Sequence, residues 1–322
     1  MNNYRIFKTA HMKRTIITLM LCIASAYTTF ACDICGCGVG TYYMGILPDF
    51  NKRFVGLRYQ SRPLTSHLGP GGERTPLTAD ETYQSMELWG AWNFGTRWRA
   101  MAIVPYNFNR REIPGSGETG TKNGVGDIAV MGYYKLFERL AGTSDKILVH
   151  SLWAGVGVKT PTGQYDNSER TNAASQDSPN NFQLGTASTD FMANLAYDIR
   201  LMDLGLNVNT TYKINTENRY DYRYGNKFTA NALLYYKFNI RNQLRIAPNA
   251  GILYETQEKD ETMRRYPVAQ SGGNATTAVF GLELNAGRWS AGANHQAVID
   301  QHLAGGRVSA GNRWMTHVSV SF

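Results

Sequence analysis

Three cysteines near the start of the chain, Cys32, Cys35 and Cys37, form a Cys-x-x-Cys-x-Cys pattern. Soft thiolates at this spacing suit Cu(I) or zinc, although a tetrahedral zinc site needs a fourth ligand that Asp33 is badly placed to supply. In an oxidising compartment a disulfide is equally natural, and the odd count leaves one thiol for lipid, metal or another chain. The three cysteines are therefore metal or disulfide candidates, with a redox or docking role as a further alternative. No cofactor other than copper or zinc is suggested.

Histidine and serine residues give a weaker signal. His150 and Ser151 are adjacent in a segment predicted to be a strand, so their side chains would point to opposite faces. His295, His302 and His317 have no serine at a spacing typical of a hydrolytic pair. We therefore expect that the protein is not an enzyme.

The residues before the cysteines predict a signal peptide, residues 1–31. Lys13 and Arg14 precede an apolar run, and Thr29-Phe30-Ala31 fits a small-residue cleavage site; the true start is either Met1 or Met12. Cleavage after Ala31 would leave Cys32 first, which keeps lipidation open. Removing four bases and no acid changes 33 Lys and Arg to 29, against 25 Asp and Glu. So small an excess on a secreted protein argues against nucleic acid as a partner.

The rest of the chain, 53–322, contains short segments in which apolar and polar residues alternate. A strand has a side-chain period of two, so each segment can present one face to lipid and the other to water. The last one, Trp314 to Phe322, ends on an aromatic residue and resembles the closing strand of a bacterial outer-membrane barrel. The candidates lie near 53–62, 83–95, 97–109, 125–137, 146–160, 186–199, 203–216, 226–239, 242–256, 274–285, 288–301 and 308–322.

This pattern predicts an all-β fold, a transmembrane antiparallel β-barrel of about twelve strands, with ten or fourteen as alternatives. Short joins alternate with long ones at 63–82, 110–124, 161–185, 217–225 and 257–273, as in a barrel with tight periplasmic turns and longer outer loops. An even strand number places both termini in the periplasm. A soluble β-sandwich would also alternate, but it explains neither the signal peptide nor the terminal Phe322. Trp89, Trp92, Trp98, Trp289 and Trp314 are expected near the membrane interfaces.

A barrel of this size should be roughly 25 Å across between backbones. The residues 32–52 that precede it are either a Cys-rich periplasmic lead-in or a plug. Its charged inward positions are the pore-lining candidates, and they are either a charge-paired wall or a weakly anion-favouring pore. These candidates are Arg58, Glu87, Arg99, Asp127, Lys135, Lys159, Asp190, Lys213, Lys237, Arg245, Glu255, Glu283 and Arg313.

Four short motifs occur in order along the chain. They are Val104-Pro105-Tyr106, Gly124-Val125-Gly126-Asp127-Ile128, Gly157-Val158-Lys159-Thr160-Pro161-Thr162-Gly163 and Leu184-Gly185-Thr186-Ala187-Ser188-Thr189-Asp190. We interpret them as strand ends and turns, with Asp127 facing inward where an inward base can pair with it. In this order they resemble the outer-membrane barrel family named for the MetA pathway of phenol degradation, over roughly 53–322. The cysteine segment resembles the start of members from Bacteroidetes-type bacteria. The resemblance implies a transport role and supplies no catalytic residues.

The sequence therefore predicts an outer-membrane channel or transporter-like barrel for small molecules. The alternatives are a copper- or zinc-linked barrel that uses the cysteine cluster, and a structural or adhesive barrel that acts through its outer loops. The expected partners are outer-membrane lipid and a small solute whose identity the sequence does not give.

Overall fold

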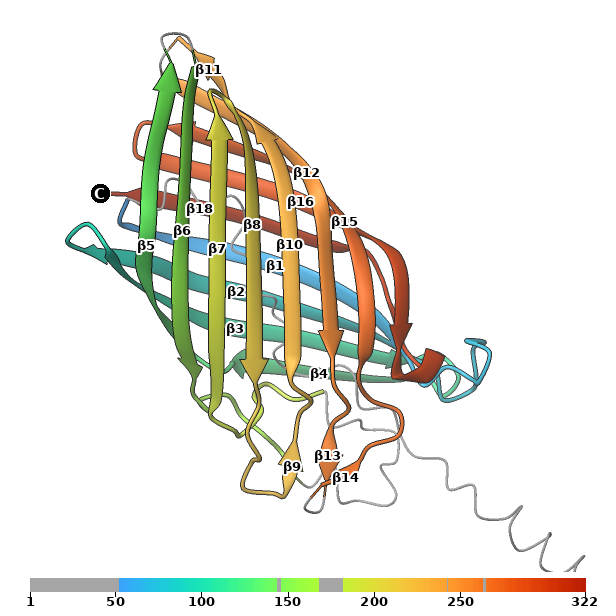
Figure 1. Cartoon of the computed structure of the whole chain (residues 1–322). Coiled ribbons are helices and arrows are strands. Elements are labelled where there is room, and N and C mark those ends of the chain that lie inside the picture. Colours follow the sequence, from blue (N-terminus) through green and yellow to red (C-terminus); the bar gives the residue numbers. More distant parts are fainter. Residues whose placement is uncertain (1–51, 144–145, 168–181, 242, 263–264) are drawn as a thin grey trace, which may run out of the picture. The chain divides into compact units, whose positions relative to one another are not determined.

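The computed structural model describes residues 52–143, 146–167, 182–241, 243–262 and 265–322. In these residues, twelve long antiparallel strands pair edge to edge into one closed barrel (Figure 1). The long strands are β1 (Phe54–Ser66), β2 (Ala79–Phe94), β3 (Trp98–Ile113), β5 (Ala129–Thr143), β6 (Lys146–Lys159), β7 (Asp190–Leu201), β8 (Leu204–Ile214), β10 (Lys227–Tyr236), β12 (Leu244–Gln257), β15 (Gly273–Ala286), β16 (Trp289–Leu303) and β18 (Arg313–Ser321). The predicted count of twelve is confirmed. The predicted signal peptide and all three cysteines of the cluster lie outside the described residues.

The strand that ends the chain also closes the barrel. β18 pairs with β1 from Ser321 opposite Phe54 to Trp314 opposite Ser61, and its other edge pairs with β16. Each of the twelve long strands thus has a hydrogen-bonded neighbour on both edges. Such closure is what a sheet needs in hydrocarbon, where each unpaired backbone group costs several kcal/mol.

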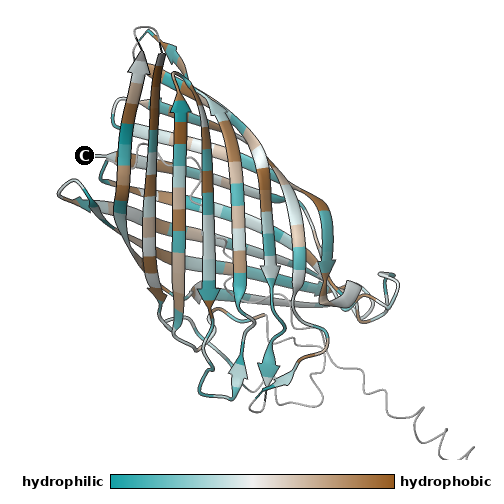
Figure 2. Ribbon diagram, viewed as in Figure 1, coloured by the Kyte–Doolittle hydropathy of each residue, from teal (hydrophilic) through white to brown (hydrophobic). Residues whose placement is uncertain are grey.

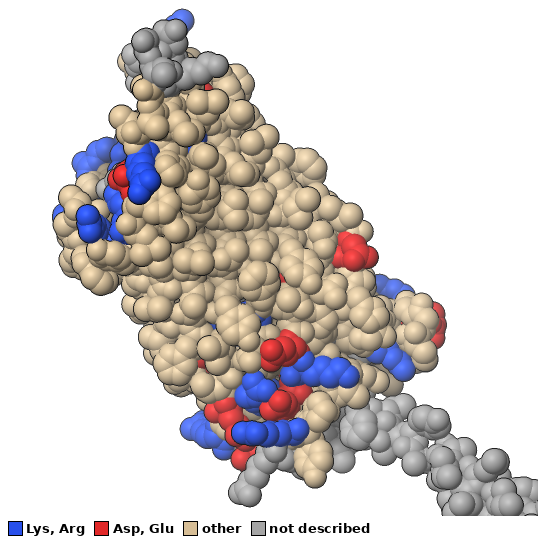
Figure 3. All heavy atoms as spheres, viewed as in Figure 1, with Lys and Arg blue, Asp and Glu red and all other residues tan. Residues whose placement is uncertain are grey.

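The two faces of the barrel wall differ as the alternation predicts. Along β8, the odd-numbered residues from Gly205 to Lys213 are buried on the inner face, and the even-numbered residues are more exposed on the outer face. Large apolar side chains such as Leu195, Leu234 and Phe280 are half or more exposed. Figure 2 shows the alternating hydropathy along the ribbons, and Figure 3 shows Lys, Arg, Asp and Glu gathered near the two ends with a largely uncharged belt between them. The outer face is therefore suited to lipid.

The two ends of the barrel carry different connections. At the turn end, tight joins such as 95–97 and 202–203 link neighbouring strands; at the loop end lie longer segments such as 67–78, 215–226 and 258–272. Trp92, Trp98 and Trp289 are exposed beside these tight joins, as expected for a membrane interface. Trp89 contradicts that expectation: the odd-numbered residues of β2 face inward, and Trp89 is buried against Phe54.

Several strand boundaries differ from those predicted. The third strand does not close at Val104-Pro105-Tyr106 but continues to Ile113, and β4 (Glu118–Val125) pairs with this extension in a region predicted as loop. Pro105 lies where the partner of β3 changes from β5, which pairs with Trp98–Ile103, to β4. Proline has no N–H to donate to a neighbouring strand. It therefore destabilises the sheet little at a position where the partner strand changes. The fourth long strand accordingly starts at Ala129 rather than 125.

Small elements that the alternation did not predict lie at both ends of the barrel. β9 (Tyr222–Arg223), β13 (Glu261–Thr262) and β14 (Tyr266–Pro267) form a separate three-stranded sheet, β11 (Phe238–Ile240) extends the barrel at the turn end, and β17 (Ser309–Ala310) extends the pairing of β1. Strands of two or three residues are too short to show a period. Among the described residues, no helix has the length and apolar character needed to cross a membrane.

Candidate functional site

The inner wall of the barrel is rich in polar and charged side chains, and it holds the predicted pore-lining residues. Lys237 and Arg245 are half-buried close to the turn end, and the Asp127 carboxylate is almost fully buried at the loop end. The other ten candidates are buried on the inner face: Arg58, Glu87, Arg99, Lys135, Lys159, Asp190, Lys213, Glu255, Glu283 and Arg313. Their burial shows that the interior is filled around them rather than wide open.

One group of contacts gathers around Glu87 on β2. Its carboxylate accepts hydrogen bonds from Arg58 Nε at 2.6 Å, Gln60 Nε2 at 3.1 Å and Ser85 Oγ at 3.2 Å. The Arg58 guanidinium also lies 5.1 Å from the centre of the Trp89 ring. Both oxygens of this carboxylate are therefore occupied.

A second group, around Glu255 on β12, reaches across the lumen. Lys227 Nζ on the neighbouring β10 donates to Oε1 at 2.8 Å, and Arg313 on β18 contacts Oε2. In the strand order, β15 and β16 separate β12 from β18. The Arg313–Glu255 ion pair therefore bridges part of the barrel interior instead of lying along one wall.

A third group joins three of the four sequence motifs at the loop end. Asp127 Oδ1 accepts the backbone N–H of Gly163 at 2.9 Å, and Oδ2 accepts the N–H and hydroxyl of Thr186 at 2.9 and 2.8 Å. Lys159 Nζ lies 2.6 Å from Asp127 Oδ2 and 3.1 Å from Asp190 Oδ2. The prediction that Asp127 faces an inward base is confirmed, and these motifs form one connected site rather than separate turns.

The contacts of Asp127 hold a piece of chain against the inner wall, which we call the inner segment, residues 182–188. Phe182 to Thr186 are buried, and Asn107 Nδ2 on β3 donates to the Leu184 carbonyl at 3.2 Å. The Phe182 ring lies 6.4 Å from Tyr83, an inward residue of β2. A Cβ on Gly185 would be 2.5 Å from Asp127 Oδ1, so only glycine allows this approach. The inner segment thus narrows the loop end.

Several inward charged residues were missed at the sequence level. Arg62 and Lys227 lie on strands that were predicted, at positions whose parity matches Arg58 and Asn231, so the alternation contained the signal. Glu81 and Arg111, whose charged groups are 3.8 Å apart, lie in stretches predicted as loops, where no period was assigned. His317 faces inward as the alternation requires and lies 3.0 Å from Glu283.

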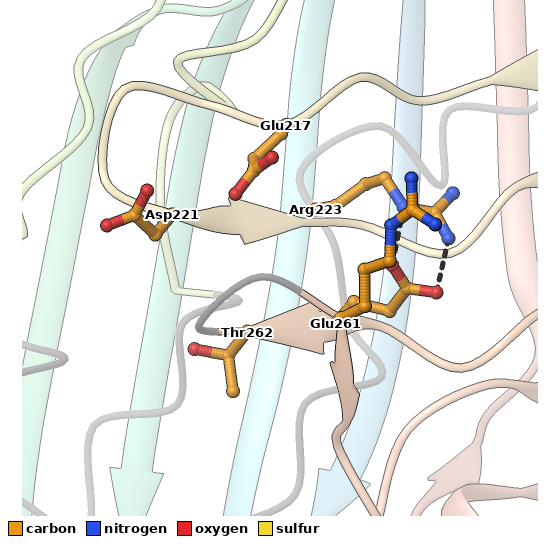
Figure 4. Close-up of a pocket in the computed structure, with 6 residues that line it drawn as sticks. Glu217, Asp221, Arg223, Glu261 and Thr262 are labelled. Atoms are coloured by element: carbon orange, nitrogen blue, oxygen red, sulfur yellow. Dashed lines mark hydrogen bonds and ion pairs between the residues drawn. The ribbon is translucent and has the colours of Figure 1, made fainter.

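A cavity of about 270 Å³ lies among the small strands of the loop end and is lined by Glu217, Asp221, Arg223, Glu261, Thr262 and Arg265 (Figure 4). Arg223 Nε of β9 donates to Glu261 Oε2 of β13 at 3.0 Å. This hydrogen bond lowers the pKa of the Glu261 carboxyl and raises that of Arg223. The ion pair links the two strands, and this structural role accounts for it.

The histidines considered for catalysis have other neighbours. His150 Nδ1 lies 3.4 Å from the Tyr197 hydroxyl, and the His295 ring packs against Trp314 with centroids 4.1 Å apart. In the described ranges, no group of three or more His, Cys, Asp or Glu side chains is arranged to hold a metal ion. The cysteine cluster lies outside those ranges, so its metal and disulfide alternatives stay predictions.

The family described as "Putative MetA-pathway of phenol degradation" matches residues 71–297, which is most of the chain. The chain belongs to this family. Three of the four motifs that carry the resemblance in the sequence are those that meet around Asp127, so in this member of the MetA-pathway family they have a shared structural role.

Among solved structures, an outer membrane channel from Pseudomonas putida F1 is similar, with 13% identity and a TM-score of 0.59 over 86% of this chain and 100% of that one. The β domain of the Bordetella autotransporter BrkA shows 12% identity and a TM-score of 0.45, covering 84% and 100% of the two chains. The first similarity concerns the fold of an outer-membrane barrel. A search of curated proteins found no match.

Proposed function

We propose that this member of the MetA-pathway family is an outer-membrane channel for small solutes, with both termini in the periplasm and the loop end outside the cell. The contrast between the two faces of the wall carries the proposal. An apolar outer belt matches lipid, whereas the inner face keeps charged residues such as Arg58, Glu87 and Glu255 along the barrel.

The filled interior predicts the size of the current steps that a single channel gives. Since the Arg313–Glu255 pair spans part of the lumen and the inner segment lies at the loop end, we expect small current steps rather than those of a wide pore. Replacing Arg313 by Gln removes the bridge while Lys227 still neutralises Glu255, so the steps should grow. Arg139→Gln, at an exposed position near the turn end, is the matched control and should conduct as the wild type does.

Planar bilayers containing purified, folded protein test the proposal, with solute flux into liposomes as a second readout. Correctly inserted protein that gave neither ion current nor flux would refute the channel. For orientation, a short epitope inserted between Gly71 and Glu73 should be accessible on intact cells, whereas an epitope at Met202–Asp203 should not. The opposite pattern would reverse the proposed topology.

A further inference from the structure

We infer that the barrel interior contains a binding site for a small oxyanion, a carboxylate or phosphate group, with Arg62 as the residue that contacts it. The inference rests on the proposed channel function and names the class of solute that the interior favours. Arg62 lies on the inner face of β1, four residues from Arg58 and four from the end of that strand at the loop end. A solute entering from the loop end would therefore meet it before the Arg58–Glu87 pair.

The neighbourhood of Arg62 contains more basic groups than acidic ones. Arg62 interacts electrostatically with Arg58, Glu87, Glu255 and Arg313, and Lys227 interacts with both Arg62 and Arg313. These groups come from five strands, with β1, β2 and β18 on one side and β10 and β12 on the other, so the two sets face one another across the interior. Among these strongest electrostatic partners, four bases share two carboxylates, a formal charge of +2.

Both carboxylates in this neighbourhood are already engaged. Glu87 accepts from Arg58, Gln60 and Ser85, and the two oxygens of Glu255 take Lys227 and Arg313. The Nε atom of Arg62, by contrast, is buried and has no hydrogen-bond partner among the described residues. A buried N–H donor without an acceptor is unfavourable, and the guanidinium that carries this one stays charged. An anion would supply both the acceptor and the missing negative charge.

The chemistry of Arg62 selects the kind of anion. A guanidinium presents parallel N–H donors that match the two oxygens of a carboxylate or phosphate, which a spherical ion matches less well. The side chain as a whole is only half-buried, so it remains reachable. Arg58 and Arg313 lie nearby and would hold the anion electrostatically without releasing their own carboxylates.

The test is ion selectivity in planar bilayers under a KCl gradient, followed by addition of inorganic phosphate. Wild-type protein should favour chloride over potassium, and phosphate should reduce the chloride current. Arg62→Gln should lower the chloride-to-potassium permeability ratio roughly sevenfold, because one unit charge about 7 Å from the ion path in water changes the two permeabilities by about threefold each, in opposite directions. Arg62→Glu should favour potassium, and Arg62→Lys should keep chloride selectivity but lose most of the phosphate block.

The control is Arg110→Gln, which removes the same charge from an exposed pair with Glu112 and should leave selectivity unchanged. Circular dichroism and resistance to proteolysis establish that each variant is folded. Current without anion selectivity, or a phosphate block that survives in Arg62→Gln, would overturn the anion site while leaving the channel intact. Absence of any current from folded wild-type protein would instead refute the channel function.

Discussion

The carboxylate of Asp127 is predicted to hold the inner segment in place, and Asp127→Ala would remove that support. The substitution leaves the backbone N–H groups of Gly163 and Thr186 without their acceptor, and Lys159 with Asp190 as its remaining described carboxylate. No strand pairing involves the side chain of Asp127, which lies just before β5. The effect should therefore be local to the loop end.

The magnitude follows from the contacts that are lost. Hydrogen bonds to a charged acceptor contribute about 1.5–3 kcal/mol each, so the N–H and hydroxyl donors of Thr186 together stabilise the closed position by about 3 kcal/mol at the low end. Because 1.4 kcal/mol corresponds to a factor of ten, the opened population of the inner segment should rise roughly hundredfold. The contacts of Asn107 and Asn109 with the same segment would remain and limit the release.

Amide hydrogen exchange measured by mass spectrometry on detergent-solubilised barrel is the appropriate assay. Peptides covering residues 182–188 should exchange much faster in Asp127→Ala, while peptides from β8 should be unchanged. Glu112→Ala, which removes an exposed carboxylate from the β3 extension, is the matched control and should leave the inner segment protected. Equal protection of residues 182–188 in wild type and Asp127→Ala would show that Asp127 does not hold the segment.

Three further predictions concern other parts of the chain. Leu195→Lys on the outer apolar belt should destabilise the inserted barrel by about 2–4 kcal/mol, whereas Leu140→Lys near the turn end should destabilise it by at most about 1 kcal/mol. Urea unfolding in lipid vesicles measures both values. Equal destabilisation by the two variants would argue against a lipid-facing belt at Leu195. Since the pKa of the Glu261 carboxyl is lowered, its hydrogen bond with Arg223 should be fully present above pH 4.5, the ordinary pKa, and be lost as the pH falls through the lowered pKa. The loss should appear as faster amide hydrogen exchange in residues 222–225. Glu261→Gln should show this faster exchange already at pH 7. If the cysteine cluster binds copper or zinc, Cys35→Ser and Cys37→Ser should each reduce the bound metal; equal stoichiometry would leave the disulfide and lipid alternatives.

The strand architecture was predictable because a closed barrel imposes a local period. On β8 and β18 each residue's face follows from its parity, and the structure confirms the inward and outward sets for both. Strand ends were less accessible to this reasoning. The extension of β3 beyond Pro105 depends on pairing with β4, and that pairing involves residues up to nineteen positions apart, from Tyr106 opposite Val125. A local pattern carries no information about such a partner.

For the side chains inside the barrel, too, the local sequence predicts which face a residue occupies but not which distant residue it contacts. Alternation assigns Arg313 and Glu255 to the inner face, but it does not indicate that they meet, since they are 58 residues apart and come from strands that are not neighbours. The choice between a charge-paired wall and an anion-favouring pore depends on such meetings. The structure contains extensive pairing, and the anion site proposed at Arg62 would make the two interpretations apply to different positions of one wall.

The convergence on Asp127 gives a physical reason for motifs that otherwise resemble ordinary turns. The connection between β6 and β7 runs from residue 160 to 189, and bringing the two ends of so long a connection together has a cost in conformational entropy. Asp127, just before the neighbouring β5, contacts both ends of this connection through Gly163 and Thr186. One carboxylate thereby shortens the effective loop and directs its returning part into the barrel. Narrowing of the loop end is thus specified by the motifs themselves, and the charged interior around Arg62 lies behind it.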